Sequence, residues 1–211
     1  EQTVIKSFYG NQEDDYLGSS GVTALGNNNF VIASPGDNDS VGGNEDAGSV
    51  MLVNGATGLQ IGVTLVGDQK DDQLGNGGVT ALGNNNFVIA SPFDKVDGND
   101  NAGSVMLVSG TTGLQIGVTL VGDEAQDRLG YSGVTALGNN NFVIASQWDD
   151  DKVDGNEDAG SVMLVNGTTG LQIGVTLVGD QKDDYLGNSS VTALGNNNFV
   201  IASAFDSVDG N

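Results

Sequence analysis

The sequence contains neither cysteine nor histidine. Disulfide bonds, thiolate and imidazole nucleophiles and most zinc sites are therefore excluded, because each needs one of these side chains. Carboxylates remain as the groups with which an active site could be built. A carboxylate pair could hydrolyse glycosides, but the acidic residues recur in every repeat described below and no single pair stands out. We therefore expect a protein that is not an enzyme.

Basic residues are scarce as well. Six Lys and Arg residues stand against 28 Asp and Glu residues, which gives a formal net charge of -22. This charge repels phosphate backbones and anionic lipid surfaces, so we expect no nucleic-acid partner and no direct membrane insertion. Cations are the natural counterpart of so acidic a chain, although solubility alone would also account for the charge.

Long apolar runs are missing too. No run reaches the length of about 18 residues that a membrane-spanning helix requires. The first residues, Glu1 to Val4, lack the basic and apolar regions of a signal peptide. We expect a soluble chain and, if it is secreted, a mature or trimmed form.

Internal repetition is what the sequence has in abundance. The segment Val-Thr-Ala-Leu-Gly-Asn-Asn-Asn-Phe-Val-Ile-Ala-Ser occurs four times without change, beginning at Val22, Val79, Val134 and Val191. The unit of about 57 residues is close in length to one four-stranded propeller blade. The repeats predict a single repeat domain over residues 1–211, with units at 1–21, 22–78, 79–133, 134–190 and 191–211.

Length varies in one acidic loop of each unit. A second block, Ala-Gly-Ser-Val-Met-Leu-Val, begins at Ala47, Ala102 and Ala159. Its distance to the following Val-Thr-Ala-Leu segment never changes, so every insertion falls between the first block and the second. A fixed frame with one variable loop is typical of packed strands that carry surface insertions.

Short apolar segments between turn residues predict four strands per unit. Turn signals such as Asn54-Gly55 favour hairpins, and strands that are apolar at successive positions indicate sheets covered on both faces. We expect almost no helix and an all-β fold of four-stranded, β-propeller-like blade repeats, about four in number. In the second unit the expected strands are Val79 to Leu82, Phe87 to Ser91, Ser104 to Val108 and Leu114 to Val121.

The strand count leaves one blade incomplete. Thr3 to Gly10 corresponds to the fourth strand of a unit, three full units follow, and two more strands precede Asn211. The total of fifteen is one short of four complete blades and would leave an open strand edge. Ring closure by the N-terminal strand, strand pairing between neighbouring molecules and a longer repeat array are the alternatives.

The repeated motifs resemble FG-GAP repeats, the blades of integrin α-subunit propellers and of many bacterial surface proteins. Leu74-Gly75 stands where that family has Phe-Gly, and Ala90-Ser91-Pro92 where it has Gly-Ala-Pro. The sequence is still more similar to bacterial extracellular adhesin-like repeats, through Trp148-Asp149 and Gly167 to Gly170 among others. The resemblance implies surface attachment or assembly. The calcium-binding turn of the integrin-type family is not carried over, because Gly83 to Asn86 contains no carboxylate.

The variable loops are candidate calcium sites, because clustered carboxylates beside a glycine can supply the oxygen ligands that Ca²⁺ prefers. Solvated turns are the alternative, since Asp-Gly-Asn runs are ordinary turn chemistry. The candidate ligands are Asp37, Asp39, Asp46, Asp94, Asp97, Asp100, Asp151, Asp154 and Asp158.

Two further sets of residues recur at fixed positions. One aspartate in each unit is followed by a single residue and then by Leu-Gly; these are Asp15, Asp72, Asp127 and Asp184. We expect them to cap turns by accepting backbone N–H bonds; a metal-ligand role is the alternative. Phe93, Trp148 and Phe205 follow the second strand of their units. They could stack on the sugar rings of a glycan or fill the gap between blades.

Taken together, these features favour a non-enzymatic structural protein located outside the cell or on its surface. We expect a subunit of a fibre or surface assembly that self-associates through strand pairing between subunits. The alternative is an adhesin-type module that binds a glycan or protein partner through its variable acidic loops.

Overall fold

The fold is described by a computed structural model for residues 6–10, 12–13, 15–38, 42–150 and 154–205. These residues form 14 strands and a single 3-10 turn, η1 (Gly195–Asn197), and contain no α-helix. The expected all-β fold of four-stranded blade repeats is confirmed.

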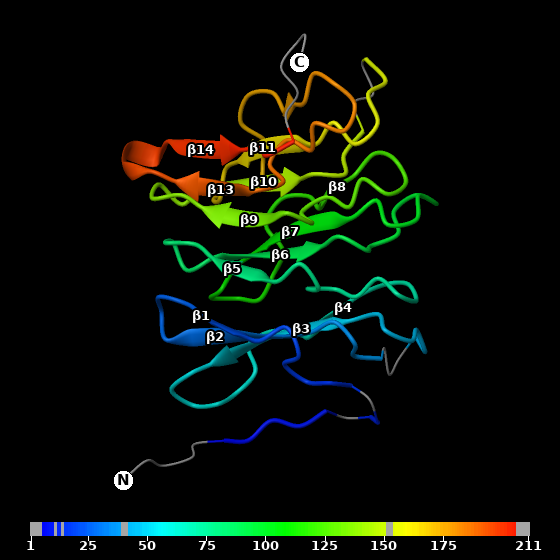
Figure 1. The fold of residues 1–211 in the computed structure, drawn as a ribbon. Helices are drawn as coiled ribbons and strands as arrows, with labels where there is room; N and C mark the ends of the chain where they lie inside the picture. Colours follow the sequence, from blue (N-terminus) through cyan, green and yellow to red (C-terminus); the bar gives the residue numbers. More distant parts are fainter. Residues whose placement is uncertain (1–5, 11, 14, 39–41, 151–153, 206–211) are drawn as a thin grey trace.

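Three complete blades and one half-blade follow one another along the chain (Figure 1). Each complete blade is an antiparallel meander in which strands consecutive in sequence are neighbours in the sheet. Blade 1 contains β1 (Val22–Ala24), β2 (Asn29–Ser34), β3 (Ser49–Asn54) and β4 (Leu65–Val66); blade 2 contains β5 (Val79–Ala81), β6 (Phe87–Ser91), β7 (Ser104–Val108) and β8 (Leu120–Val121); blade 3 contains β9 (Gly133–Ala136), β10 (Phe142–Ser146), β11 (Ser161–Val165) and β12 (Leu177–Val178); the half-blade contains β13 (Ser190–Ala193) and β14 (Phe199–Ala202).

The first three strands of each unit lie where the sequence predicts them, but the fourth is shorter. In blade 2 the expected strand over residues 114–121 is reduced to β8, and Gln115 forms only an isolated bridge with Val108. Gly117 between them has a φ of +72°, a left-handed conformation that interrupts an extended strand. A side chain there would also meet the carbonyl oxygen of Thr169 in the next blade at 2.5 Å. The fourth strand is therefore short because the backbone at Gly117 turns to pack closely against the next blade.

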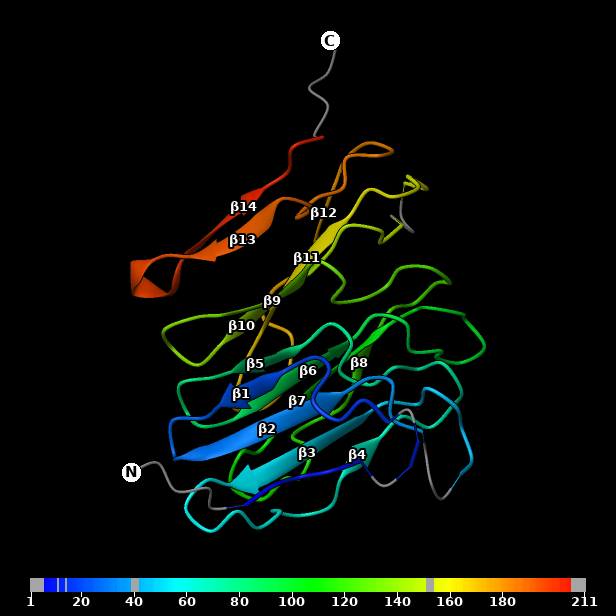
Figure 2. The same cartoon turned by 60° about the horizontal axis from the view of Figure 1, so that its bottom comes forward.

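The N-terminal segment does not join a sheet in its described part. Residues 6–10 lie beside blade 1 (Figures 1 and 2), and Phe8 meets Phe30 of β2 edge to face at 6.1 Å between ring centroids. By sequence register Phe8 corresponds to Leu65 of β4, which packs into the core between blades 1 and 2. The segment thus takes the place that the fourth strand of a preceding blade would have.

Each blade has two different apolar faces, and consecutive blades pack one kind against the other. We call the face toward the next blade along the chain the forward face and the opposite one the backward face. The forward face of blade 1 presents Val31 and Leu52 to the backward face of blade 2, which presents Phe87 and Ile89. The same arrangement recurs between blades 2 and 3. Burial of each such side chain contributes roughly 1.5–3 kcal/mol, so the junctions between blades make up the hydrophobic core.

Hydrogen bonds between consecutive blades stabilise the same junctions. The hydroxyl of Thr23 in β1 donates to the carbonyl oxygen of Val79 in β5 at 3.0 Å, and Thr80 and Thr135 repeat this contact at the next two junctions. The side-chain amides of Asn27 and Asn29 both donate to the Gly110 carbonyl in the next blade, at 3.0 and 2.8 Å. The invariant Asn-rich turn therefore binds the neighbouring blade.

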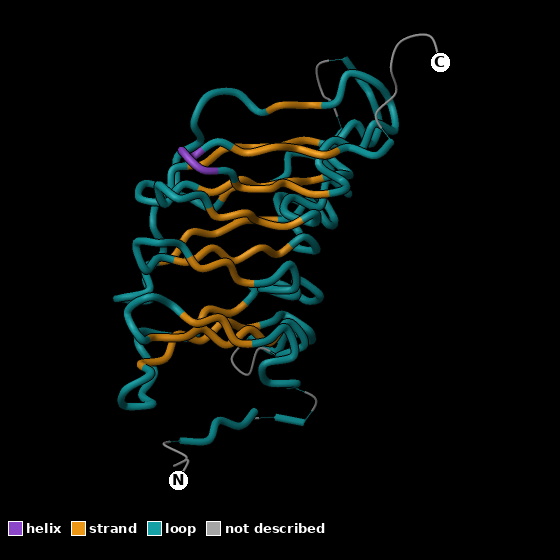
Figure 3. Tube along the Cα trace, turned by 60° about the vertical axis from the view of Figure 1, so that its left-hand side comes forward, coloured by secondary structure: helices purple, strands orange, loops and turns teal. Residues whose placement is uncertain are grey.

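The blades form an open stack. In Figure 3 their strands lie one above another like rungs, and in Figures 1 to 3 blade 1 and the half-blade lie at opposite ends of the stack. The described residues therefore do not form the closed ring that was one of the alternatives from the sequence. The forward face of the half-blade is consequently left at one end.

Candidate functional sites

Two groups of three carboxylates lie where the chain passes from one blade to the next. The first group is Asp68 and Asp72, from the linker between blades 1 and 2, together with Asp94, from the loop after β6. The second is its repeat counterpart, Asp123, Asp127 and Asp149. Within each group one carboxylate oxygen per residue lies within 4.8 Å of the others. Each group could therefore offer three oxygen ligands to one cation.

The central carboxylate of each group is held by its own turn. One oxygen of Asp72 accepts the backbone N–H of Gln69 at 2.6 Å, and one oxygen of Asp127 accepts those of Asp123 and Glu124 at 2.9 and 2.7 Å. Asp15 and Asp184 make the equivalent contact with Gln12 and Gln181. The expected turn-capping role of these four residues is thus seen in the structure.

Burial and mutual repulsion oppose ionisation of these groups. Burial, followed by the nearby charge of Asp94, raises the pKa of Asp72 to about 7 against the backbone hydrogen bond that lowers it. Burial likewise raises the pKa of Asp127 to about 7, and that of Asp149 to about 6. Bringing several carboxylates together in a poorly solvated place costs free energy unless protons or cations compensate their charge.

The first group lines a cavity of about 440 Å³ between blades 1 and 2. Its walls include Val66 of blade 1, Ser91 and Ser104 of blade 2, and the three carboxylates. Lys95, Val96 and Asp97 of the variable loop complete its lining, so the cavity lies between the blade junction and this loop.

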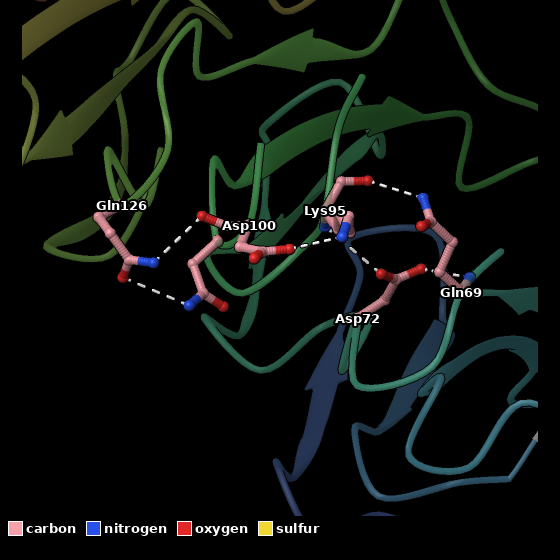
Figure 4. A network of polar contacts seen from close by, with 6 residues as sticks. Gln69, Asp72, Lys95, Asp100 and Gln126 are labelled. Atoms are coloured by element: carbon pink, nitrogen blue, oxygen red, sulfur yellow. Dashed lines mark hydrogen bonds and ion pairs between the residues drawn. The ribbon is translucent and has the colours of Figure 1, made fainter. Parts of the chain in front are cut away.

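A polar network joins the variable loop of blade 2 to the linkers on either side (Figure 4). Gln69 donates to the carbonyl oxygen of Lys95 at 2.9 Å, and Lys95 forms an ion pair of 2.6 Å with Asp100. Gln126, in the following linker, donates to the Asp100 carbonyl at 3.3 Å. The loop is therefore fastened at both blade junctions.

The candidate calcium ligands of the variable loops are distributed differently from the expectation. Asp94 joins a carboxylate group, whereas Asp39 and Asp151 lie outside the described residues. Asp46, Asp97 and Asp158 have positive φ values and occupy tight turns. Among the residues that the structure describes, none of the other candidates belongs to a group of three acidic side chains close enough to share an ion; these are Asp37, Asp46, Asp97, Asp100, Asp154 and Asp158.

Asp68, Asp123 and Asp149 were not singled out by the sequence. A signal for the first two existed, because Val-Gly-Asp recurs before three of the four turn-capping aspartates, at Asp68, Asp123 and Asp180. What the pattern could not show is that the loop after the second strand returns to this turn, which depends on how the linker crosses from blade to blade.

The three aromatic side chains that the sequence singled out belong to one row. Phe93, Trp148 and Phe205 alternate with Tyr131 and Tyr185 in edge-to-face contacts, with ring centroids 5.3 to 6.4 Å apart. The Arg128 guanidinium lies within 6 Å of three of these rings, at 5.9, 5.8 and 5.8 Å from the centroids. The row runs from blade 2 to the half-blade, so it bridges the blade junctions on the surface.

The half-blade carries an open edge and an exposed face. Among the described strands, β14 pairs with β13 alone, whereas β2, β6 and β10 are each paired on both sides. Leu194 is 47% exposed, while its counterparts Leu25, Leu82 and Leu137 are at most 5% exposed. Val200 is 51% exposed, and Thr192 is exposed as well.

Comparison with known protein families finds the same unit three times in tandem. Residues 24–76, 81–131 and 136–188 each match a family described as a repeat of unknown function, DUF5650. No curated protein matches the chain. Within the part of the chain that the structure describes, no helix has the length and apolarity needed to cross a bilayer.

Proposed function

Since the chain belongs to the DUF5650 repeat family, whose units stack face to face here, we propose that it is a non-enzymatic structural protein that assembles outside the cell. Its subunits join head to tail at the half-blade, where β14 accepts a strand from a neighbouring molecule. The observation that carries this proposal is the exposed forward face of the half-blade. Its side chains Leu194 and Val200 have counterparts in all three complete blades, and there they are buried at the junction with the next blade.

The junctions within the chain indicate what this face can bind. At the two junctions between complete blades a leucine of one blade lies over a glycine of the next, Leu25 at Gly110 and Leu82 at Gly167. Valine side chains of the forward face contact Phe and Ile side chains of the backward face. Leu194 and Val200 present the same shape and chemistry, so the complementary surface is the backward face of another blade of this kind.

A second copy of the chain supplies such a surface. The backward face of blade 1 contains Phe30, Ile32 and Val53, and residues 6–10 already lie across it in the place of a fourth strand. A blade shared by two molecules would combine β13 and β14 of one with this segment of the other, which would pair with β14 directly because no third strand follows β14 among the described residues. Heterologous contacts of this type generate open filaments when the rotation between copies does not close a ring.

The backbone of β14 favours strand addition. The carbonyls of Asn198 and Ala202 accept hydrogen bonds from Leu194 and Ser189 on the β13 side. Because backbone groups alternate in direction along a strand, those of Phe199 and Ile201 point to the open edge. An extended segment can hydrogen-bond there by β-augmentation.

The sequence resemblances support an extracellular place for this assembly. The motifs resemble FG-GAP blades and, more closely, the repeats of bacterial adhesin-like surface proteins. The chain also contains no cysteine and carries a formal net charge of -22. We therefore propose a bacterial fibre or surface layer as the setting.

Sedimentation velocity over a range of concentrations tests the assembly. The wild-type chain is expected to form species larger than a monomer, and Leu194→Asp to abolish them by placing a charge in the docking face. Leu171→Asp is the matched control, because Leu171 is 60% exposed and lies outside every blade junction core. A wild-type chain that stays monomeric at all concentrations, or a control that fails equally, would reject docking through this face.

The aromatic row favours a second candidate function, an adhesin-type module for a glycan. Tyr131 is 43% exposed and Phe205 59% exposed, and exposed rings beside polar loops can stack on sugar rings. A glycan array probed with the monomeric Leu194→Asp variant tests this candidate. Binding that is lost on Phe205→Ala would support it, and an array without bound glycans would reject it.

A further inference from the structure

One buried oxygen of the Asp127 carboxylate has no hydrogen-bond partner among the described residues. Asp127 is 1% exposed, and its Oδ2 atom accepts two backbone N–H bonds from its own turn. Its Oδ1 atom is buried and has no hydrogen-bond partner among the residues that the structure describes. Leaving a buried acceptor unsatisfied costs about 1–3 kcal/mol, and more when it is charged.

Two further carboxylates converge on the same place. Asp123 comes from the same linker turn and Asp149 from the loop after β10, and each has a carboxylate oxygen within 4.8 Å of one on Asp127. The Ser161 side chain hydrogen-bonds to Asp149, which fixes that group without neutralising it. Oxygens that ligate one Ca²⁺ at about 2.4 Å can be no more than about 4.8 Å apart.

The surroundings of this group are more acidic than those of its counterpart between blades 1 and 2. The residues next to Asp123 and Asp149 are Glu124 and Asp150, where the counterpart has Gln69 and Lys95. Asp150 and Glu124 add to the negative charge felt by Asp149. In the counterpart, the Lys95 backbone N–H reaches the second oxygen of Asp72 at 3.4 Å. The Oδ1 atom of Asp127 receives no such hydrogen bond from the described residues.

We propose that Asp123, Asp127 and Asp149 bind one Ca²⁺, which fastens the linker leaving blade 2 to the body of blade 3. Hard oxygen ligands without nitrogen or sulfur suit Ca²⁺ or Mg²⁺ rather than a transition metal. Ca²⁺ accepts irregular coordination of six to eight oxygens, whereas Mg²⁺ demands near-octahedral geometry and dehydrates reluctantly. Three carboxylates from two segments, with one held rigidly by its turn, fit the more tolerant ion. This site is independent of the proposed self-association.

Terbium luminescence and calorimetry on the chelator-treated, full-length Leu194→Asp variant test the proposal without interference from assembly. Trp148, the single tryptophan, is adjacent to Asp149, so Tb³⁺ bound at this site should emit when tryptophan is excited. The emission should saturate near one equivalent, decline when Ca²⁺ is added, and persist in a similar concentration of Mg²⁺. Ca²⁺ should also raise the melting temperature, because it binds only the folded chain.

Three substitutions locate the ion. Asp149→Asn and Asp123→Asn should each weaken Ca²⁺ binding by about tenfold or more, since each removes one charged ligand. Asp154→Asn removes one charge from the same loop outside the group and should leave binding unchanged. Circular dichroism establishes that each variant is folded. Absence of saturable binding, equal loss in Asp154→Asn, or equal competition by Mg²⁺ would overturn the calcium site.

Discussion

At the residue scale, glycines at the blade junctions are held by close backbone contacts. A Cβ atom on Gly110 would lie 1.9 Å from the Asn85 carbonyl oxygen and 2.5 Å from Leu25 Cδ1. Gly55 and Gly167 occupy equivalent places, with the nearest carbonyl oxygen at 2.0 and 1.7 Å. These positions accept only glycine because a neighbouring turn and, at Gly110 and Gly167, a leucine of the preceding blade fill the space.

We predict that Gly110→Ala lowers the free energy of unfolding by about 1–3 kcal/mol, because the junction between blades 1 and 2 must open to admit the methyl group. Urea denaturation measures this change. Gly195→Ala, at a glycine with no atom within 4 Å of the added carbon, should change stability much less. Equal stability of Gly110→Ala and wild type would show that the junction is not packed as described.

The carboxylate groups show what residue patterns leave open. The turn-capping aspartates could be predicted because they stand at one fixed distance from Leu-Gly in every unit. Asp94 was also a candidate, but its partners Asp68 and Asp72 lie in another segment. Their convergence is set by the path of the linker between blades, which no local pattern encodes.

At the element scale, the repeated apolar blocks predict the strands well. Strands β6 and β7 have the expected bounds, and β5 differs from them by one residue. The fourth strand was predicted too long, because apolar residues continue through Gly117 while the backbone turns there. The strand is limited to the two residues of β8 by contact with the following blade, and such a tertiary contact cannot be seen in the local sequence.

The open edge of β14 leads to a prediction for this element. A peptide with the sequence of residues 159–166, which contains β11, should bind β14 as β11 binds β10 and should shorten any assemblies by occupying the edge. Light scattering during assembly measures the effect. The same peptide with Met163→Pro lacks an N–H that faces the paired strand and should be inactive. Inhibition by both peptides, or by neither, would argue against strand addition at β14.

At the scale of the whole molecule, the stack is polar. Every junction joins the forward face of one blade to the backward face of the next, so growth by the same contact preserves direction. The sequence predicted four repeated units and their packing but left the ring and the stack open, because repeat identity does not fix the rotation from one blade to the next. The structure resolves this choice through junctions that place blade 1 and the half-blade at opposite ends of the stack.

Electron microscopy of the purified chain tests head-to-tail docking most directly. We predict filaments whose layers continue the spacing of the blades within one molecule, formed by the wild-type chain and by Leu171→Asp but not by Leu194→Asp. Separate, single-molecule stacks for the wild-type chain, or filaments that form equally with Leu194→Asp, would contradict assembly through the half-blade.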